Sequence, residues 1–235
     1  GERQDERMQA VAIATQLDYY YFQGTNEDSV IHYTNKVKEF AKATHQPKYY
    51  YFAWANRLIT YYLKTSRTNI ALYEVQNMLK EAQEEDDKTG LSRCYNIMSQ
   101  IYTIKRFDSM AFEWRLKEIE LTEKYKIENY NISQTYAQIA NYYINQKKQK
   151  EALAAVEKAI ATANSSTQQI SAKLEFVNYY SKFGDFQAAE KLLKECQAAF
   201  EQDKRLESIK KRLYNIECLY YQQTKQYPKA LEAAK

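Results

Sequence analysis

Glycine and proline are scarce in this chain of 235 residues, which has only four glycines and two prolines. A β-sheet protein of this length needs many more turn residues, so the scarcity argues against sheet architectures. Helix-forming residues such as Ala, Leu, Lys, Glu and Gln are abundant instead. The composition therefore predicts an all-α fold, and a hydrophobic content of 45% is enough to build a core.

The sequence also has no long apolar run, and its mean hydropathy is -0.74. A membrane-spanning helix needs about 20 consecutive apolar residues, so we expect no span within this stretch. The chain begins with Gly1 rather than Met and ends in the helix-like stretch YPKALEAAK. We interpret it as a piece of a longer protein, so missing targeting signals say nothing about its location.

Catalytic and metal-binding patterns are missing as well. The sequence has no HExxH, GxSxG, GxGxxG or P-loop pattern. The two histidines, His32 and His45, have no third ligand at suitable spacing. The acidic stretch EAQEEDDK at 81–88 lacks the alternating oxygen ligands and the glycine of a calcium loop. We therefore predict no enzymatic activity, no metal and no cofactor.

The cysteine spacing and the charge distribution argue against two further kinds of protein, those built on cysteine-pair motifs and those that bind nucleic acid. Cys94, Cys196 and Cys218 form no CxxC pair, and each falls in a helical pattern that favours a small core residue. A disulfide between Cys196 and Cys218 stays open for an oxidising compartment. The net charge of +4 comes from 34 basic and 30 acidic residues that are interspersed. Such a distribution lacks the basic stripe of a nucleic-acid-binding face, so no nucleic-acid partner is predicted.

Tyrosine is the unusually abundant residue, with 23 copies, and several of them recur in one arrangement. In three places a tyrosine pair is followed by a small residue at a constant distance. These are Tyr142-Tyr143 with Ala152, Tyr179-Tyr180 with Ala189, and Tyr220-Tyr221 with Ala230. Apolar residues around them are spaced by three and four, which places them on one face of each of two helices.

This pattern resembles the tetratricopeptide repeat (TPR), in which small residues at positions 8, 20 and 27 let two helices approach closely. The resemblance implies a TPR-like α-solenoid, a right-handed superhelix of about five to six helix pairs with one continuous core. It would cover 1–235 as a single array. The approximate units are 10–51, 52–91, 92–132, 133–169, 170–210 and a truncated 211–235.

The register is ambiguous in two units. The first unit has Tyr20 or Tyr21 at one contact position, and the third has Met110 or Ala111 at its small position. In each tyrosine pair, we expect the second ring to pack between the helices of its own unit. The first ring should face the preceding unit's second helix.

Two further local expectations follow from the sequence. The run YYYF occurs at 19–22 and at 49–52. Its rings cannot all face one core, so some should line the concave surface or meet a partner. Asp108 and Asp185 are candidate N-caps of second helices.

In a TPR array, the first helices line a concave groove, chiefly through positions 2, 5, 6, 9, 12 and 13. The resemblance carries eight polar residues onto that surface: Asn56, Arg57, Arg93, Asn96, Gln100, Asn141, Asn178 and Asn215. A ladder of amides can bind the backbone of an extended peptide, and Arg57 and Arg93 could meet a carboxylate. The alternative is that asparagine is simply common at position 9 and satisfies neighbouring helix ends. The order of lysines and arginines in carboxylate-clamp repeats is not reproduced.

The composition and the lengthened repeats are similar to the repeat regions of Bacteroidetes-type sensor proteins. In those proteins, such an array precedes a membrane helix and a histidine kinase or a helix-turn-helix output. The resemblance implies a non-catalytic protein- or peptide-binding module, the periplasmic or other extracytoplasmic input region of a signal-transduction protein. Two alternatives stay open, a cytoplasmic peptide-sensing regulator and an assembly scaffold.

Overall fold

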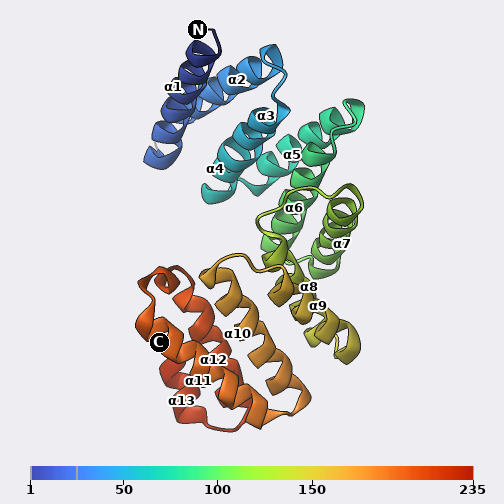
Figure 1. Cartoon of the computed structure of the whole chain (residues 1–235), viewed down its shortest axis with the longest axis vertical. Helices are drawn as coiled ribbons and strands as arrows, with labels where there is room; N and C mark the ends of the chain where they lie inside the picture. The colour runs from blue at the N-terminus through green and yellow to red at the C-terminus, as the bar shows by residue number, and fades with distance from the viewer. Residues whose placement is uncertain (1, 25, 235) are drawn as a thin grey trace. The chain divides into compact units, whose positions relative to one another are not determined.

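The computed structural model describes residues 2–24 and 26–234, which form helices and no strand (Figure 1). These helices fall into two compact units, Gly1–Ile127 and Glu128–Lys235. Within each unit, consecutive helices joined by short links pair into hairpins, and each hairpin packs on the next. The predicted all-α helical-repeat solenoid is therefore confirmed.

Three hairpins make up the described part of the first unit. The first joins α1 (Glu2–Gln23) to α2 (Glu27–Ala43). The second begins with one continuous helix built from α3 (Pro47–Ala53), the π-helix η1 (Trp54–Ile59) and α4 (Thr60–Lys64), and ends with α5 (Thr68–Glu84). The third joins α6 (Lys88–Ile104) to α7 (Asp108–Tyr125).

The second unit likewise contains three hairpins among its described residues. They are α8 (Ile132–Asn145) with α9 (Gln149–Ala161), α10 (Ser166–Phe183) with α11 (Phe186–Gln202), and α12 (Lys210–Gln223) with α13 (Tyr227–Ala233). A 3₁₀-helix, η2 (Lys204–Ile209), leads into α12.

Helix starts and predicted unit starts do not coincide everywhere. The helices α3, α6 and α10 begin at Pro47, Lys88 and Ser166, ahead of the unit starts predicted at 52, 92 and 170. The units were aligned on contact residues rather than on helix ends. The unit boundaries, the single array over 1–235 and its superhelical hand therefore stay predictions.

Small residues lie where the two helices of a hairpin contact each other. Five of them, at most 5% exposed, are Ala71, Ala111, Ala152, Ala189 and Ala230. In the third hairpin, the small position belongs to Ala111, because Met110 is 41% exposed. A small side chain lets two helix backbones approach closely, which explains why this position recurs.

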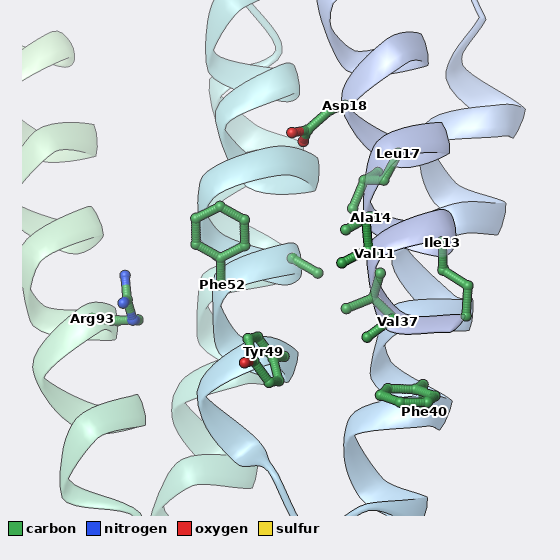
Figure 2. A pocket seen from close by; sticks show the side chains of 12 residues that line it. Val11, Ile13, Ala14, Leu17, Asp18, Val37, Phe40, Tyr49, Phe52 and Arg93 are labelled. Carbon is green, nitrogen blue, oxygen red and sulfur yellow. The ribbon is translucent and has the colours of Figure 1, made fainter. Parts of the chain in front are cut away.

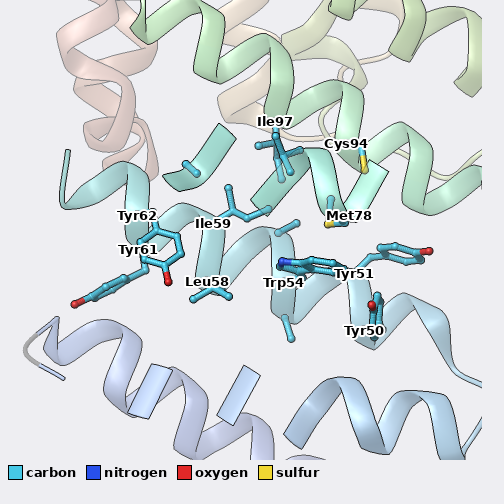
Figure 3. Packing of buried hydrophobic residues seen from close by; sticks show 14 of the residues in the cluster. Tyr50, Tyr51, Trp54, Leu58, Ile59, Tyr61, Tyr62, Met78, Cys94 and Ile97 are labelled. Atoms are coloured by element: carbon cyan, nitrogen blue, oxygen red, sulfur yellow. The ribbon is translucent and has the colours of Figure 1, made fainter. Parts of the chain in front are cut away.

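Aromatic rings dominate the core of the first unit (Figure 3). Tyr50 meets Tyr51 and Trp54 edge to face, with ring centroids 5.0 and 5.5 Å apart. At the first YYYF run, Tyr21 is the buried ring, whereas Tyr19 and Phe22 are exposed. The exposed rings confirm that some rings of these runs face outward, whereas the register of the first hairpin stays a prediction.

The tyrosine pair of the last hairpin packs as predicted. Tyr220 belongs to a buried cluster that includes Ala189 and Leu193 of α11 in the preceding hairpin, and this burial raises the pKa of its hydroxyl. The second ring, Tyr221, lies 5.5 Å from the ammonium of Lys229 on α13 of its own hairpin. Tyr220 is 4% exposed and Tyr221 half-buried, so the first ring is the more deeply buried of the two.

The predicted N-caps have different outcomes. Asp185 caps α11, because its side chain accepts a hydrogen bond of 3.0 Å from the amide of Ala188. Asp108 is the first residue of α7 rather than its cap, so that prediction is wrong. Phe107 occupies the cap position without a side-chain hydrogen bond, and Asp108 instead places negative charge in the first turn, where the helix dipole favours it.

Each hairpin from the second onward turns through one residue with left-handed backbone. These residues are Ser66, Arg106, Lys147, Gly184 and Lys225, with φ between 56 and 91°. Their spacing of 37 to 41 residues repeats the spacing of the tyrosines and alanines. Only glycine adopts this conformation without a steric penalty from its side chain.

We expect Gly184→Ala to lower the free energy of unfolding by about 1 kcal/mol, because alanine is strained at a φ of 91°. No side chain crowds the site, so the effect isolates backbone strain. Lys147→Gly, at the equivalent turn, is the matched variant and should change stability in the opposite direction. Urea denaturation followed by circular dichroism measures both, and equal signs for the two variants would contradict the explanation.

Candidate functional site

A cavity of about 560 Å³ opens between α1, α2 and α3 in the first unit (Figure 2). Its walls are apolar apart from Asp18 and Arg93. The principal apolar side chains are Val11, Ala14 and Leu17 of α1, Val37 and Phe40 of α2, and Tyr49 and Phe52 of α3. Val11 and Tyr49 are 55% and 41% exposed, so the cavity is open to solvent. We call it the α1–α3 cavity.

An ion pair joins α1 to the π-helix beside the cavity. Arg57 Nε donates to Asp18 Oδ1 at 2.5 Å, and the guanidinium lies over the ring of Phe52, 4.7 Å from its centroid. The π-helix inserts an extra residue, which changes the direction of Arg57 relative to a regular α-helix. Arg57 thus pairs with Asp18 of α1 and packs on the ring of Phe52.

Arg93 has a different environment. It extends from α6 toward the side of α3 that carries Phe52 and Tyr49 (Figure 2). Its Nε is buried and makes no hydrogen bond with any residue that the structure describes. Desolvation by burial is what lowers the pKa of this guanidinium. A half-buried cation therefore stands at an apolar cavity without a counterion from the described residues.

In the second unit, three side chains from neighbouring first helices meet on one carboxylate. Asn141 of α8 and Asn178 of α10 donate their Nδ2 groups to Glu175 Oε1 at 3.1 and 2.9 Å. Arg212 of α12 donates from Nη2 to Glu175 Oε2 at 2.7 Å. Glu175 itself is 2% exposed. We call these residues the Glu175 cluster.

A similar arrangement holds the amides of α6 in the first unit. Asn96 donates to both carboxylate oxygens of Glu118 on α7, at 3.1 and 3.2 Å, and accepts a bond of 2.6 Å from Gln100 Nε2. Glu118 is 1% exposed. In both units, asparagine amides of the predicted groove thus bind the chain's own buried glutamates, and the Oδ1 atoms of Asn96 and Asn141 also accept hydrogen bonds from Gln100 and Asn145.

The eight predicted groove residues are therefore grouped rather than equivalent. Asn141 and Asn178 lie together, as do Asn96 and Gln100, while Asn56 lies next to Arg57 in the π-helix and is half-buried. Gln100 and Asn215 are exposed. A continuous amide ladder through all of them stays a prediction.

Sequence reasoning missed Glu175, Arg212 and the cavity-lining residues of α1. Glu175 and Arg212 stand at positions 6 and 2 of their units, which are groove positions in the resemblance. Charged residues at groove positions are the signal that points to Glu175 and Arg212, whereas the prediction used only amides and two arginines. The α1 residues gave no comparable signal, because an apolar helix face normally indicates core.

Within 2–24 and 26–234, no group of three or more His, Cys, Asp or Glu side chains is arranged to hold a metal ion. The three cysteines are free, and burial raises the pKa of the Cys94 thiol to about 12 and that of Cys196 to about 11. These two thiols stay protonated at neutral pH and are poor nucleophiles.

None of the helices formed by the described residues has the length and apolar character needed to cross a bilayer.

Comparisons with known proteins support the fold. No protein-family model and no curated protein sequence matches the chain. Among solved structures, it is similar to BtubC (BKLC) from P. vanneervenii, with 16% identity, a TM-score of 0.65 and coverage of 89% of this chain and 88% of that one. It is also similar to a Rap protein complexed with competence and sporulation factor, with 15% identity, a TM-score of 0.59 and coverage of 95% and 74%. At these identities the likeness concerns the helical-repeat fold.

Proposed function

We propose that this chain is a non-catalytic module that binds an apolar segment of a peptide or protein in the α1–α3 cavity. The observation that carries the proposal is the cavity itself, an open apolar space of about 560 Å³ between helices. Ligand sites of proteins are commonly concave, largely apolar and of this size, with a few polar groups that fix orientation. The exposed Val11 and Tyr49 would be covered by the ligand.

Two further features support a binding role. Two amides of the predicted groove, Gln100 and Asn215, are exposed and can hydrogen-bond to the backbone of an extended peptide. A Rap protein of similar fold was solved in complex with competence and sporulation factor, so this architecture accommodates a bound partner in another protein. We propose the same general use for this chain.

A finer proposal concerns the full-length protein to which this chain belongs. The chain would be the extracytoplasmic input region of a histidine kinase or transcription regulator; the alternatives are a cytoplasmic peptide-sensing regulator and an assembly scaffold. The intact gene distinguishes them. A signal peptide upstream and an apolar stretch of about 20 residues downstream would favour the first. A DNA-binding helix pair without a membrane segment would favour the second.

The binding role is tested with Val11→Asp. A carboxylate in the apolar cavity must be desolvated when a ligand enters, so affinity for apolar peptides should fall roughly ten-fold or more. Val11 is 55% exposed, and the free energy of unfolding should change by no more than about 0.5 kcal/mol. Fluorescence polarisation against a library of short apolar peptides measures the affinity.

Ile104→Asp is the matched control, because Ile104 is 52% exposed on α6 and does not line the cavity. Its affinity for the same peptides should equal that of the unmodified protein. Equal affinity of the Val11→Asp protein would remove the α1–α3 cavity as the binding site. Failure of every peptide to bind the unmodified protein would overturn the proposed function.

A further inference from the structure

Arg57 and Arg93 are both candidates for binding a ligand carboxylate, but they differ in whether they already have a carboxylate partner. Arg57 already has a carboxylate partner in Asp18 at 2.5 Å, and its guanidinium also lies over the ring of Phe52. A ligand carboxylate would have to displace Asp18 to reach it. Arg57 is therefore a structural residue that holds α1 against the second hairpin.

Arg93 lacks such a partner. Its Nε is buried without a hydrogen bond, and among the residues that the structure describes no carboxylate pairs with it. An unpaired donor away from water costs about 1–3 kcal/mol, and more when it is charged. A ligand carboxylate that reaches the guanidinium through the cavity would offset part of this cost.

The surroundings of Arg93 define which acceptor fits. The cavity beside it is lined by Phe52, Tyr49 and the alanine and valine side chains of α1, and its other charged lining residue, Asp18, is bound to Arg57. One guanidinium balances one negative charge and can bind a carboxylate through two parallel N–H bonds. A phosphate dianion would leave one charge uncompensated against apolar walls.

We propose that the α1–α3 cavity takes the apolar end of a peptide that terminates in a free carboxylate, and that Arg93 binds this carboxylate. The apolar side chains would pack on Val11, Ala14 and Phe52, and the chain terminus would point to α6. This inference rests on the proposed function and names the ligand class for the same site.

The test compares two matched libraries of short apolar peptides, one with free C-terminal carboxylates and one with C-terminal amides. We expect the free acids to bind the unmodified protein at least roughly ten-fold more tightly, the usual effect of one charge-assisted hydrogen bond. Arg93→Met keeps the apolar stem and removes the charge, so both libraries should then bind with equal affinity. Arg93→Lys should restore part of the preference.

Arg106→Met is the control, because Arg106 is exposed in the same unit and does not line the cavity. This variant should keep the full preference for free acids. Equal binding of acids and amides to the unmodified protein would overturn the role of Arg93 and leave the proposed binding function intact. If Arg93→Met still preferred free acids over amides, the role of Arg93 would likewise be overturned, because another cation would then bind the carboxylate.

Discussion

Replacing Arg212 with methionine should lower the free energy of unfolding by about 3 kcal/mol. The substitution leaves the Glu175 carboxylate, which is 2% exposed, with two amide donors and no cation. Removing one partner of a buried ion pair typically costs 3–5 kcal/mol, and we expect the lower end because the Arg212 side chain is 29% exposed. Urea denaturation followed by circular dichroism measures the change.

Two controls accompany this variant. Glu175→Leu combined with Arg212→Met removes both charges, and most of the lost stability should return, because apolar pairs often replace buried ion pairs at little cost. Arg205→Met removes an ion pair with Asp203 in which the arginine is 78% exposed, so the loss should stay below about 1 kcal/mol. A loss of that small size for Arg212→Met would show that the Glu175 cluster is not a stabilising feature.

The variant Gly90→Ala should lower the free energy of unfolding by about 2 kcal/mol. Helix propensity alone predicts the opposite sign, since alanine is favoured over glycine within a helix by about 1 kcal/mol. A Cβ at Gly90 would lie only 2.5 to 2.8 Å from three ring carbons of Tyr51. The Tyr51 ring is fully buried and cannot move away, so the added methyl group overpacks the core. Thermal and urea denaturation measure the effect.

A second background isolates the contact. In a Tyr51→Leu protein the ring is gone, and adding Gly90→Ala should then be neutral or stabilising. The double variant should therefore lose less stability than the sum of the losses in Gly90→Ala and Tyr51→Leu alone. If Gly90→Ala raised stability in the unmodified protein, the close packing of α6 on Tyr51 would be refuted.

How far the sequence predicted the candidate site depends on the residue. Asn141 and Asn178 were placed on one surface from their repeat positions, and they do lie together. Their actual partner, Glu175, was not anticipated, because the amides were treated as groups free for a ligand. Arg57 and Arg93 looked equivalent in the sequence, yet only Arg57 has a carboxylate beside it.

The fold was far more predictable, because its signals are local. Intervals of three and four residues place Tyr220 and Ala230 on the buried faces of their helices, and the backbone geometry of a helix fixes those faces whatever surrounds it. The same local geometry sets the left-handed turn that recurs in each hairpin from Ser66 onward. Repeated contact residues therefore determined the helix hairpins, their turns and the small residues between them.

Tertiary structure alone decided which polar groups are paired and which cavity stays open. Asn141 and Arg212 reach Glu175 across 34 and 37 residues of sequence, and Arg57 reaches Asp18 across 39. Such contacts depend on how neighbouring first helices lie against each other, with a π-helix changing the direction of Arg57. Pairing of charges is a property of distance in space, which helical periodicity along the chain does not encode.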